Sequence, residues 1–176
     1  AIQHPEWCMI SPKGQLLQPD IYDIGWVTPY MRTMCLNSPY RDYLMNLIRE
    51  VRDKYPVAGF LLDSFNGFPC ICPYCIREMQ KQNLDWRDDE VLQNFGRSSA
   101  LRLAEDISAL LRPQENNLLV YFLGIAAKDN AQIGTYLECE CLPTNPTWGY
   151  DYLPLTARYY RNLTNGPVLN MTGRFN

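Results

Sequence analysis

Short apolar runs that alternate with stretches of helical periodicity are the feature of this sequence that most restricts its fold. The runs at 57–62 and 118–123 are apolar on both faces, which is typical of strands buried in a parallel sheet. Apolar residues recur at helical spacing over 40–55 and 91–111. Strands and helices that follow one another in this order predict an α/β fold, with a mainly parallel sheet and flanking helices.

Five strands are expected along the chain, at 33–36, 57–63, 118–123, 136–142 and 168–171. The fourth alternates strictly, with Glu138 and Glu140 on one face and cysteines on the other. A last helix is expected from Pro154 to about Asn162. The interval 124–134 is barely long enough for a helical crossover between parallel strands.

The length of the chain limits how much of such a fold it can complete. Its 176 residues suit one domain, and no linker or low-complexity segment divides them. A closed (β/α)8 barrel typically needs ~250 residues and rarely fewer than ~200. The first residue is Ala1 rather than Met, which indicates a processed chain or part of a longer one. We therefore expect one domain over 1–176 and an incomplete barrel-like sheet.

Charge and hydropathy exclude several classes of protein. Lys and Arg total 16 against 19 Asp and Glu, which gives a net charge of −3. No basic cluster is evident in the sequence, so a nucleic-acid partner is not expected. No segment approaches the ~20 apolar residues of a membrane span, so a membrane partner is not expected either. The sequence motifs of phosphate loops, dinucleotide sites and serine nucleophile elbows are absent.

Three of the seven cysteines, Cys70, Cys72 and Cys75, are close in sequence. Thiolates at this spacing converge on one metal ion, and Zn²⁺ prefers four ligands in a tetrahedron. Either Cys8 or His4, the single histidine, could supply the fourth ligand. The alternative is a set of reduced thiols in the core or a loop. We predict a structural zinc site, and reduced, clustered cysteines favour a cytoplasmic protein, although an exported parent protein stays an open alternative.

Three carboxylates follow or lie within the expected strands. Asp63 comes directly after a buried strand, at the edge of a parallel sheet where functional sites are built; the alternative is a helix or turn cap. Glu138 and Glu140 point the same way, and with Asp63 they offer a set for general acid and nucleophile chemistry. The alternative for these glutamates is an exposed edge strand. The aromatic segment 148–150 that follows is of the kind on which sugars stack.

Several segments spread over nearly the whole chain are shared with one group of enzymes. They lie at residues 4–7, 35–43, 59–63, 70–75, 138–143, 148–151 and 170–175. Together they resemble glycoside hydrolases with TIM-barrel folds that are related to α-L-fucosidases. More distantly, they resemble bacterial β-galactosidases that carry a trimerisation domain.

The resemblance implies a partial (β/α)8 barrel and a retaining mechanism. The five expected strands would be strands three to seven of the eight. In the α-L-fucosidases an Asp nucleophile ends the fourth strand, which is the place of Asp63, and the acid/base is a later carboxylate, here Glu140 or Glu138. The β-galactosidases have a Glu acid/base at that fourth-strand position, so Asp63 favours the fucosidase-like interpretation. Retention requires the two carboxyl groups to lie about 5–5.5 Å apart.

The same resemblance implies the remaining site residues and partners. A carbohydrate substrate would contact His4, Trp7, Trp148, Tyr150 and Arg174. In the β-galactosidases a cysteine from an earlier loop completes the zinc site, which makes Cys8 the expected fourth ligand. The alternatives are a β-galactosidase-like hydrolase and a non-catalytic carbohydrate-binding or assembly module. Activity of the isolated chain, and self-association through regions outside it, stay open.

Overall fold

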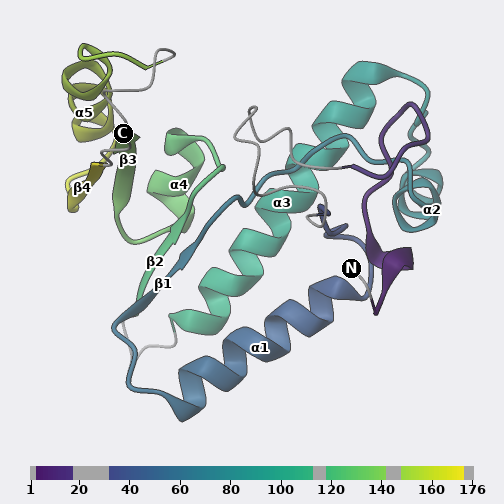
Figure 1. Cartoon of the computed structure of the whole chain (residues 1–176), viewed down its shortest axis with the longest axis horizontal. Helices are drawn as coiled ribbons and strands as arrows, with labels where there is room; N and C mark the ends of the chain where they lie inside the picture. Colours follow the sequence, from purple (N-terminus) through teal and green to yellow (C-terminus); the bar gives the residue numbers. More distant parts are fainter. Residues whose placement is uncertain (1–2, 18–31, 113–117, 142–147, 173–176) are drawn as a thin grey trace. The chain divides into compact units, whose positions relative to one another are not determined.

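The computed structural model describes residues 3–17, 32–112, 118–141 and 148–172 (Figure 1). These form two compact units. The first is drawn from residues 1–53 and 67–103, and the second from 54–66 and 104–176. The two units are separated by their internal contacts alone. The expectation of one domain over 1–176 therefore stays a prediction.

The first unit is built mainly from helices. A single 3-10 turn, η1 (Pro5–Trp7), precedes an isolated antiparallel bridge between Cys8 and Met34. Helix α1 (Tyr40–Lys54) begins where expected, because the Ser38 hydroxyl accepts a hydrogen bond from the Tyr40 amide at 3.2 Å. Helix α3 (Asp89–Leu111) also confirms the periodicity of its sequence.

The expected strand at 33–36 is not formed, and the bridge at Met34 is all that this run contributes. The chain turns immediately afterwards, since the backbone amide and the hydroxyl of Ser38 both donate to the Cys35 carbonyl, at 3.1 and 2.7 Å. Helix α2 (Pro73–Lys81) was not expected, because its proline, its cysteine and the two cysteines just before it are typical of a loop. Pro73 is instead the first residue of the helix, and Met79 on the buried face of the same helix is fully buried.

Two close backbone approaches in the first unit require glycine. A Cβ added to Gly67 would lie 2.2 Å from the Gly96 carbonyl oxygen, and one added to Gly96 would lie 2.5 Å from the Phe68 carbonyl oxygen. The segment that leads to the cysteine run therefore lies directly against the backbone of α3. No side chain fits between these two backbones without a shift of one of them.

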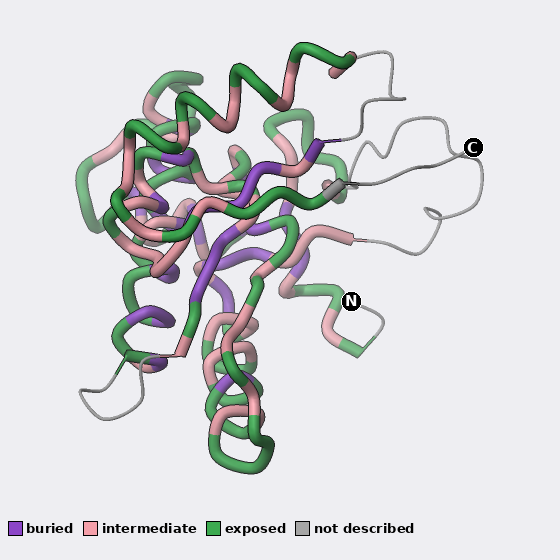
Figure 2. Tube along the Cα trace, turned by 90° about the vertical axis from the view of Figure 1, so that its left-hand side faces the viewer, coloured by how far each residue is buried: buried purple, intermediate pink, exposed green. Residues whose placement is uncertain are grey.

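The second unit holds the parallel strands and confirms the α/β class. Strand β1 (Gly59–Leu62) pairs with β2 (Leu119–Phe122), with Gly59 opposite Leu119. Strand β3 (Leu137–Cys141) pairs in parallel with β4 (Val168–Thr172). Strands β2 and β3 carry deeply buried residues, among the segments drawn as buried in Figure 2. Strand β1 was expected to be buried, but none of its residues is, and Leu61 is 44% exposed.

Short helices connect these strands. Helix α4 (Ala127–Ile133) fills the short interval between β2 and β3, so the interval does hold a helix. Within the described part of the chain, the two strands that it joins belong to separate two-stranded sheets. Fully buried Asn130 fixes α4: its side-chain amide nitrogen donates to the carbonyls of Phe122 and Ile125, and its oxygen accepts from the Phe122 amide. Helix α5 (Tyr152–Leu163) connects β3 to β4. Among the described residues, none of the helices is both long and apolar enough to cross a bilayer.

Candidate active site and metal centre

Asp63 follows β1 directly, at the carboxyl end of the strand, and its side chain is exposed. The next residue, Ser64, has a φ of 54°, which is uncommon for a residue with a side chain. The turn is held by a hydrogen bond from the Phe65 amide to the Leu123 carbonyl at 2.6 Å. The Phe65 ring packs edge-on against Phe122 at 5.2 Å. A strained but well-packed turn thus presents this carboxylate to solvent.

Glu138 and Glu140 extend from β3, whose two faces are both largely buried. Glu138 is only 9% exposed, whereas Glu140 is half-buried. The Tyr121 hydroxyl donates to the Glu138 backbone carbonyl. Burial, and then the charge of Glu138, raise the pKa of the neighbouring Tyr136 hydroxyl. The alternative of an exposed edge strand with fully solvated glutamates does not describe this strand.

The Glu140 carboxyl has a perturbed pKa. Burial raises its pKa above the usual range, and the negative charges of Asp63 and Glu138 raise it further. Asp63 and Glu140 therefore lie close enough for their charges to interact, although they come from different strands. A carboxyl group with a raised pKa close to a second carboxyl group is the arrangement used for general acid and nucleophile roles.

The predicted sugar-contacting residues fall in different places. Trp148 stacks on Tyr152 at 5.2 Å between ring centroids, and Tyr150 is 81% exposed, both in the unit that carries the carboxylates. His4 stacks on Trp7 at 3.7 Å in the first unit. Arg174 lies outside the described residues. Their contact with a sugar stays a prediction.

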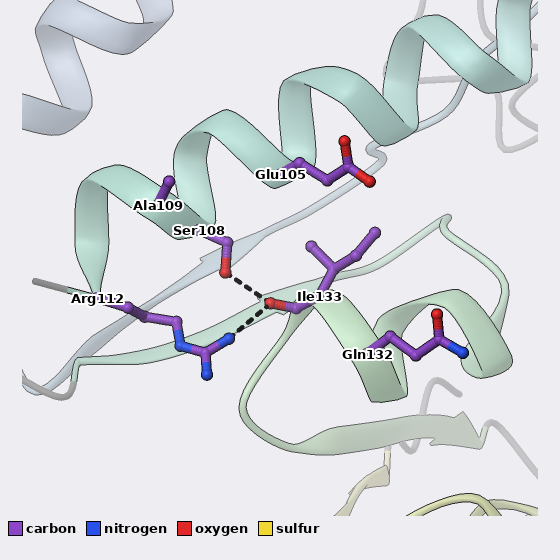
Figure 3. Close-up of a pocket in the computed structure, with 6 residues that line it drawn as sticks. All are labelled: Glu105, Ser108, Ala109, Arg112, Gln132 and Ile133. Atoms are coloured by element: carbon purple, nitrogen blue, oxygen red, sulfur yellow. Dashed lines mark hydrogen bonds between the residues drawn. The ribbon is translucent and has the colours of Figure 1, made fainter.

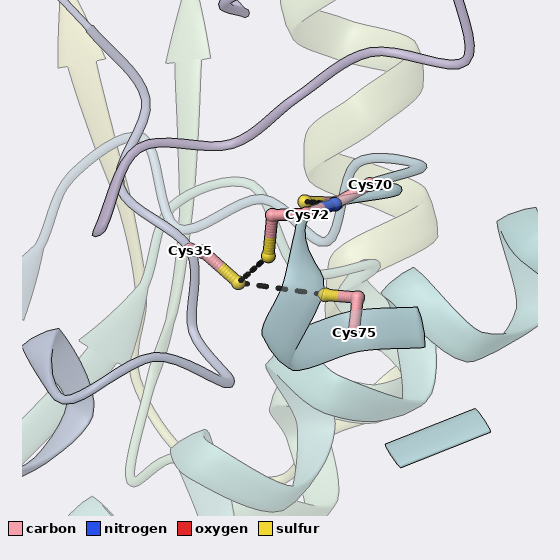
Figure 4. Close-up of side chains that lie close together, drawn as sticks. All are labelled: Cys35, Cys70, Cys72 and Cys75. Carbon is pink, nitrogen blue, oxygen red and sulfur yellow. Dashed lines mark hydrogen bonds between the residues drawn. The ribbon is translucent and has the colours of Figure 1, made fainter. Parts of the chain in front are cut away.

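Four cysteine thiols of the first unit form one buried cluster (Figure 4). The sulfur atoms of Cys35, Cys70, Cys72 and Cys75 all lie within 4.8 Å of one another. Cys35 Sγ is 3.4 Å from both Cys72 Sγ and Cys75 Sγ. The structure thus brings Cys70, Cys72 and Cys75 together, while their role as metal ligands stays a prediction. These four residues could hold a metal ion.

The fourth thiol of this cluster is Cys35, and the prediction of Cys8 is wrong. Cys8 is buried, but it pairs with Met34 across the antiparallel bridge and its thiol is not in the cluster. Cys35, the residue after Met34, contributes the fourth thiol. The Cys35 amide donates to the Trp7 carbonyl at 2.7 Å, which fixes that geometry. His4, the other alternative, instead contacts Glu6 at 3.0 Å at the surface.

The chemistry of the donors suits a thiophilic metal. Four thiolates bound at about 2.3 Å around a tetrahedral ion would have sulfur–sulfur distances of about 3.8 Å, close to the separations in this cluster. Contact with Cys35 holds the pKa of the Cys72 thiol below its usual range, while the same sulfur raises the pKa of Cys75. The cluster therefore favours a thiolate, the form that binds metal, at Cys72.

Asn37 supplies hydrogen bonds to this cluster that sequence analysis missed. Its side-chain amide donates to Cys75 Sγ at 3.4 Å and to the Ser99 hydroxyl at 3.0 Å, and its backbone amide donates to Cys35 Sγ at 3.4 Å. Ser99 in turn donates to the Phe95 carbonyl within α3. Cys35 could have been found from the sequence, because it is a further cysteine within the apolar run at 33–36. No sequence pattern distinguished Asn37.

A cavity of about 440 Å³ in the second unit is lined by residues of α3 and α4 and by Arg112 (Figure 3), and its described lining includes neither Asp63 nor the two glutamates of β3. The Ser108 hydroxyl and the Arg112 guanidinium both donate to the Ile133 carbonyl, at 2.6 and 3.2 Å. Because Ile133 ends α4, these donors satisfy a carbonyl that has no partner within its own helix. They therefore stabilise the end of α4, and we assign this cavity no chemical role.

Two comparisons with known proteins found a match for this chain. The sequence profile of a family described as "Hypothetical glycosyl hydrolase 6" matches residues 1–64. A solved structure of α-L-fucosidase isoenzyme 2 from Paenibacillus thiaminolyticus superposes with a TM-score of 0.82 at 29% sequence identity. The chain resembles the glycoside hydrolases, and among them an α-L-fucosidase. The superposition covers 99% of this chain but 27% of the fucosidase, so this glycoside hydrolase-like chain spans about a quarter of that protein. No curated protein matches the chain.

Proposed function

We propose that this chain carries the catalytic carboxylates of a retaining glycoside hydrolase with α-L-fucosidase-like specificity. The observation that carries the proposal is the raised pKa of Glu140 beside Asp63 and Glu138. The likeness to a solved α-L-fucosidase supports the substrate class. Asp63 is the nucleophile and Glu140 the acid/base, because Glu140 is more accessible to a substrate than Glu138.

The reaction proceeds in two displacements. An oxygen of ionised Asp63 attacks the anomeric carbon, the bond to the leaving-group oxygen breaks, and Glu140 donates its proton to that oxygen. Water then attacks the anomeric carbon of the glycosyl-enzyme, Glu140 accepts the proton of the water, and the Asp63 carboxylate is released. This sequence needs the carboxyl groups to lie about 5–5.5 Å apart, and it retains the configuration of the sugar.

We propose that the parallel strands belong to a partial (β/α)8 barrel. On this assignment β1 to β4 are strands four to seven, and residues 33–36 would correspond to the third strand in sequence order. The position of Asp63 and of Glu140 near the carboxyl ends of parallel strands supports it, because barrel sites form at that edge.

We further propose that Cys35, Cys70, Cys72 and Cys75 hold a structural Zn²⁺ ion. Four buried thiols leave no position open for a substrate, so the ion would stabilise the first unit and take no part in hydrolysis. Reduced thiols of this kind agree with a cytoplasmic protein. The metal is identified by elemental analysis of protein purified without added metals, with zinc expected at one equivalent.

The test of the proposed function is hydrolysis of aryl α-L-fucosides by the protein that contains this chain. Asp63→Gly should reduce turnover to background, and added azide should restore product as a glycosyl azide. Glu140→Gln should lower the rate about 10²–10⁴-fold with poor leaving groups and much less with good ones. Glu90→Gln, an exposed carboxylate of α3, is the matched control. Full activity of Asp63→Gly would disprove the assignment.

The second candidate is a carbohydrate-binding module without catalysis. The observation that favours it is the aromatic surface of Tyr150, with Trp148 stacked on Tyr152. Saturable fucoside binding with no hydrolysis by the complete protein would support this candidate over the first.

A further inference from the structure

A second cavity, in the first unit, has a composition that the proposed hydrolase chemistry does not use. It has a volume of about 270 Å³ and lies between the start of α1, helix α2 and the middle of α3. Its described lining residues are Asn37, Arg41, Tyr74, Arg77, Glu78, Lys81 and Arg102. Three separate segments of the chain therefore bring basic side chains to one hollow.

The charge of this cavity runs against that of the chain. Among the described lining residues, four basic side chains accompany one carboxylate, Glu78, whereas the whole chain carries a net charge of −3. Hydrogen bonds from Gln82 and Lys81 lower the pKa of Glu78, with a smaller contribution from the Arg102 charge. A single carboxylate leaves a surplus of about three positive charges, which would attract an anion.

Two of the guanidinium groups are positioned by neighbouring side chains. Arg102 donates to the Ser99 hydroxyl at 3.1 Å and lies 5.8 Å from the centre of the Phe95 ring. Arg77 lies 5.9 Å from the centre of the Tyr74 ring. Side chains that are already oriented lose less conformational entropy when they bind a ligand. Their planar forks match the oxygen atoms of a tetrahedral oxyanion.

We propose that this cavity binds a tetrahedral oxyanion, the phosphate or sulfate group of an ester, through Arg77, Arg102 and Lys81. Its volume is below the ~300–1,000 Å³ of pockets for drug-sized ligands, so it suits one anionic group rather than a long chain. The hydroxyl of Tyr74 supplies a further donor at the wall. This site is independent of the proposed hydrolase activity, because none of its residues belongs to the carboxylate set.

The experiment is calorimetric titration of the metal-replete protein with sodium phosphate and, separately, sodium sulfate. Sodium chloride at the same ionic strength is the reference, because it removes the general screening effect. We expect saturable binding of phosphate or sulfate, at least tenfold weaker in the double variant Arg77→Gln/Arg102→Gln. The double variant Arg49→Gln/Arg158→Gln removes the same charge from exposed sites on α1 and α5 and should bind as the parent does.

The pH dependence separates the two sources. The affinity for phosphate should increase from pH 6 to pH 8, because phosphate gains negative charge over that interval. The affinity for sulfate, whose charge is constant, should not change. Circular dichroism and metal content must be the same in all variants. Absence of saturable binding for both anions, or an equal loss of affinity in both double variants, would overturn the proposal.

Discussion

The side-chain amide of Asn37 donates to Cys75 Sγ at 3.4 Å, and both groups are held in the first unit. The same amide reaches Ser99 of α3. Hydrogen bonds to metal-bound sulfur orient the ligand and stabilise its negative charge. Asn37 therefore connects the proposed metal centre to the longest helix of the structure.

Asn37→Ala should weaken metal binding about 10-fold, because the Cys75 thiolate would lose part of its orientation and charge stabilisation. The backbone hydrogen bond to Cys35 Sγ remains in this variant. Competition with a chromogenic chelator measures this affinity. Asn46→Ala is the matched control, since Asn46 contacts only Arg49 in an exposed pair on α1 among its described hydrogen bonds. Equal affinities of the two variants would remove the positioning role of Asn37, while the metal site itself would stand if the parent protein binds.

Cys35→Ala should abolish stoichiometric metal binding, whereas Cys8→Ala should retain it. The reason is geometric, because only Cys35 places its sulfur within 4.8 Å of the other three. Plasma emission spectrometry of the two purified variants gives the metal content directly. Loss of metal from both, with unchanged secondary structure, would contradict the assignment of Cys35 as the fourth ligand.

Glu140→Gln should stabilise the protein at pH 8 and change it little at pH 4. The pKa of Glu140 is raised in the folded state, so its contribution to stability is present below the unfolded pKa and is lost as pH rises through the folded value. The neutral amide avoids that loss, since it has no charge to repel Asp63. Thermal unfolding at the two pH values measures the difference. A variant less stable than the parent at pH 8 would show that the carboxylate is compensated.

The same raised pKa sets the direction of the activity profile. Glu140 must be protonated to donate to the leaving group, so hydrolysis should fall as pH rises through its pKa. In Glu140→Gln this alkaline limb should disappear from the residual rate. A limb that persists unchanged would assign the acid to a different group, with Glu138 the first to examine.

Asn130→Ala should destabilise the fold by on the order of 2–4 kcal/mol. The substitution leaves the amide and carbonyl of Phe122 without their side-chain partner in a fully buried position. Urea unfolding gives the free energy. Asn162→Ala, which removes an exposed bond to the Arg158 carbonyl, is the control and should change stability by less than about 0.5 kcal/mol. Equal effects would refute the role of Asn130.

Periodicity predicted most of the helices and strands, but it failed where the signal was short. The long apolar patterns of α1 and α3 and the apolar strands β1 and β2 were found, with small differences at their ends. Helix α2 was missed, because nine residues that contain a proline and a cysteine give little periodicity. The run at 33–36 is too short to show whether it pairs, and a turn at Ser38 ends it.

The site could be predicted only in part, for a related reason. Asp63, Glu138 and Glu140 follow from strand position, yet their different exposure and the interaction of Asp63 with Glu140 need three-dimensional packing. The cysteine run was found from its spacing, whereas Cys35 is brought to it by a turn far away in the sequence. Asn37 acts through an amide that no local pattern distinguishes from any other.

The contact between Gly67 and Gly96 has an evolutionary consequence. A Cβ at Gly67 would clash with the backbone carbonyl of Gly96, and a Cβ at Gly96 would clash with the backbone carbonyls of Gly67 and Phe68. Because both clashes are with backbone atoms, a smaller side chain at the partner position cannot remove them. Among descendants of a common ancestor, these two positions should therefore vary together or not at all. Where both have changed, the segment between Asp63 and Cys70 should differ in length.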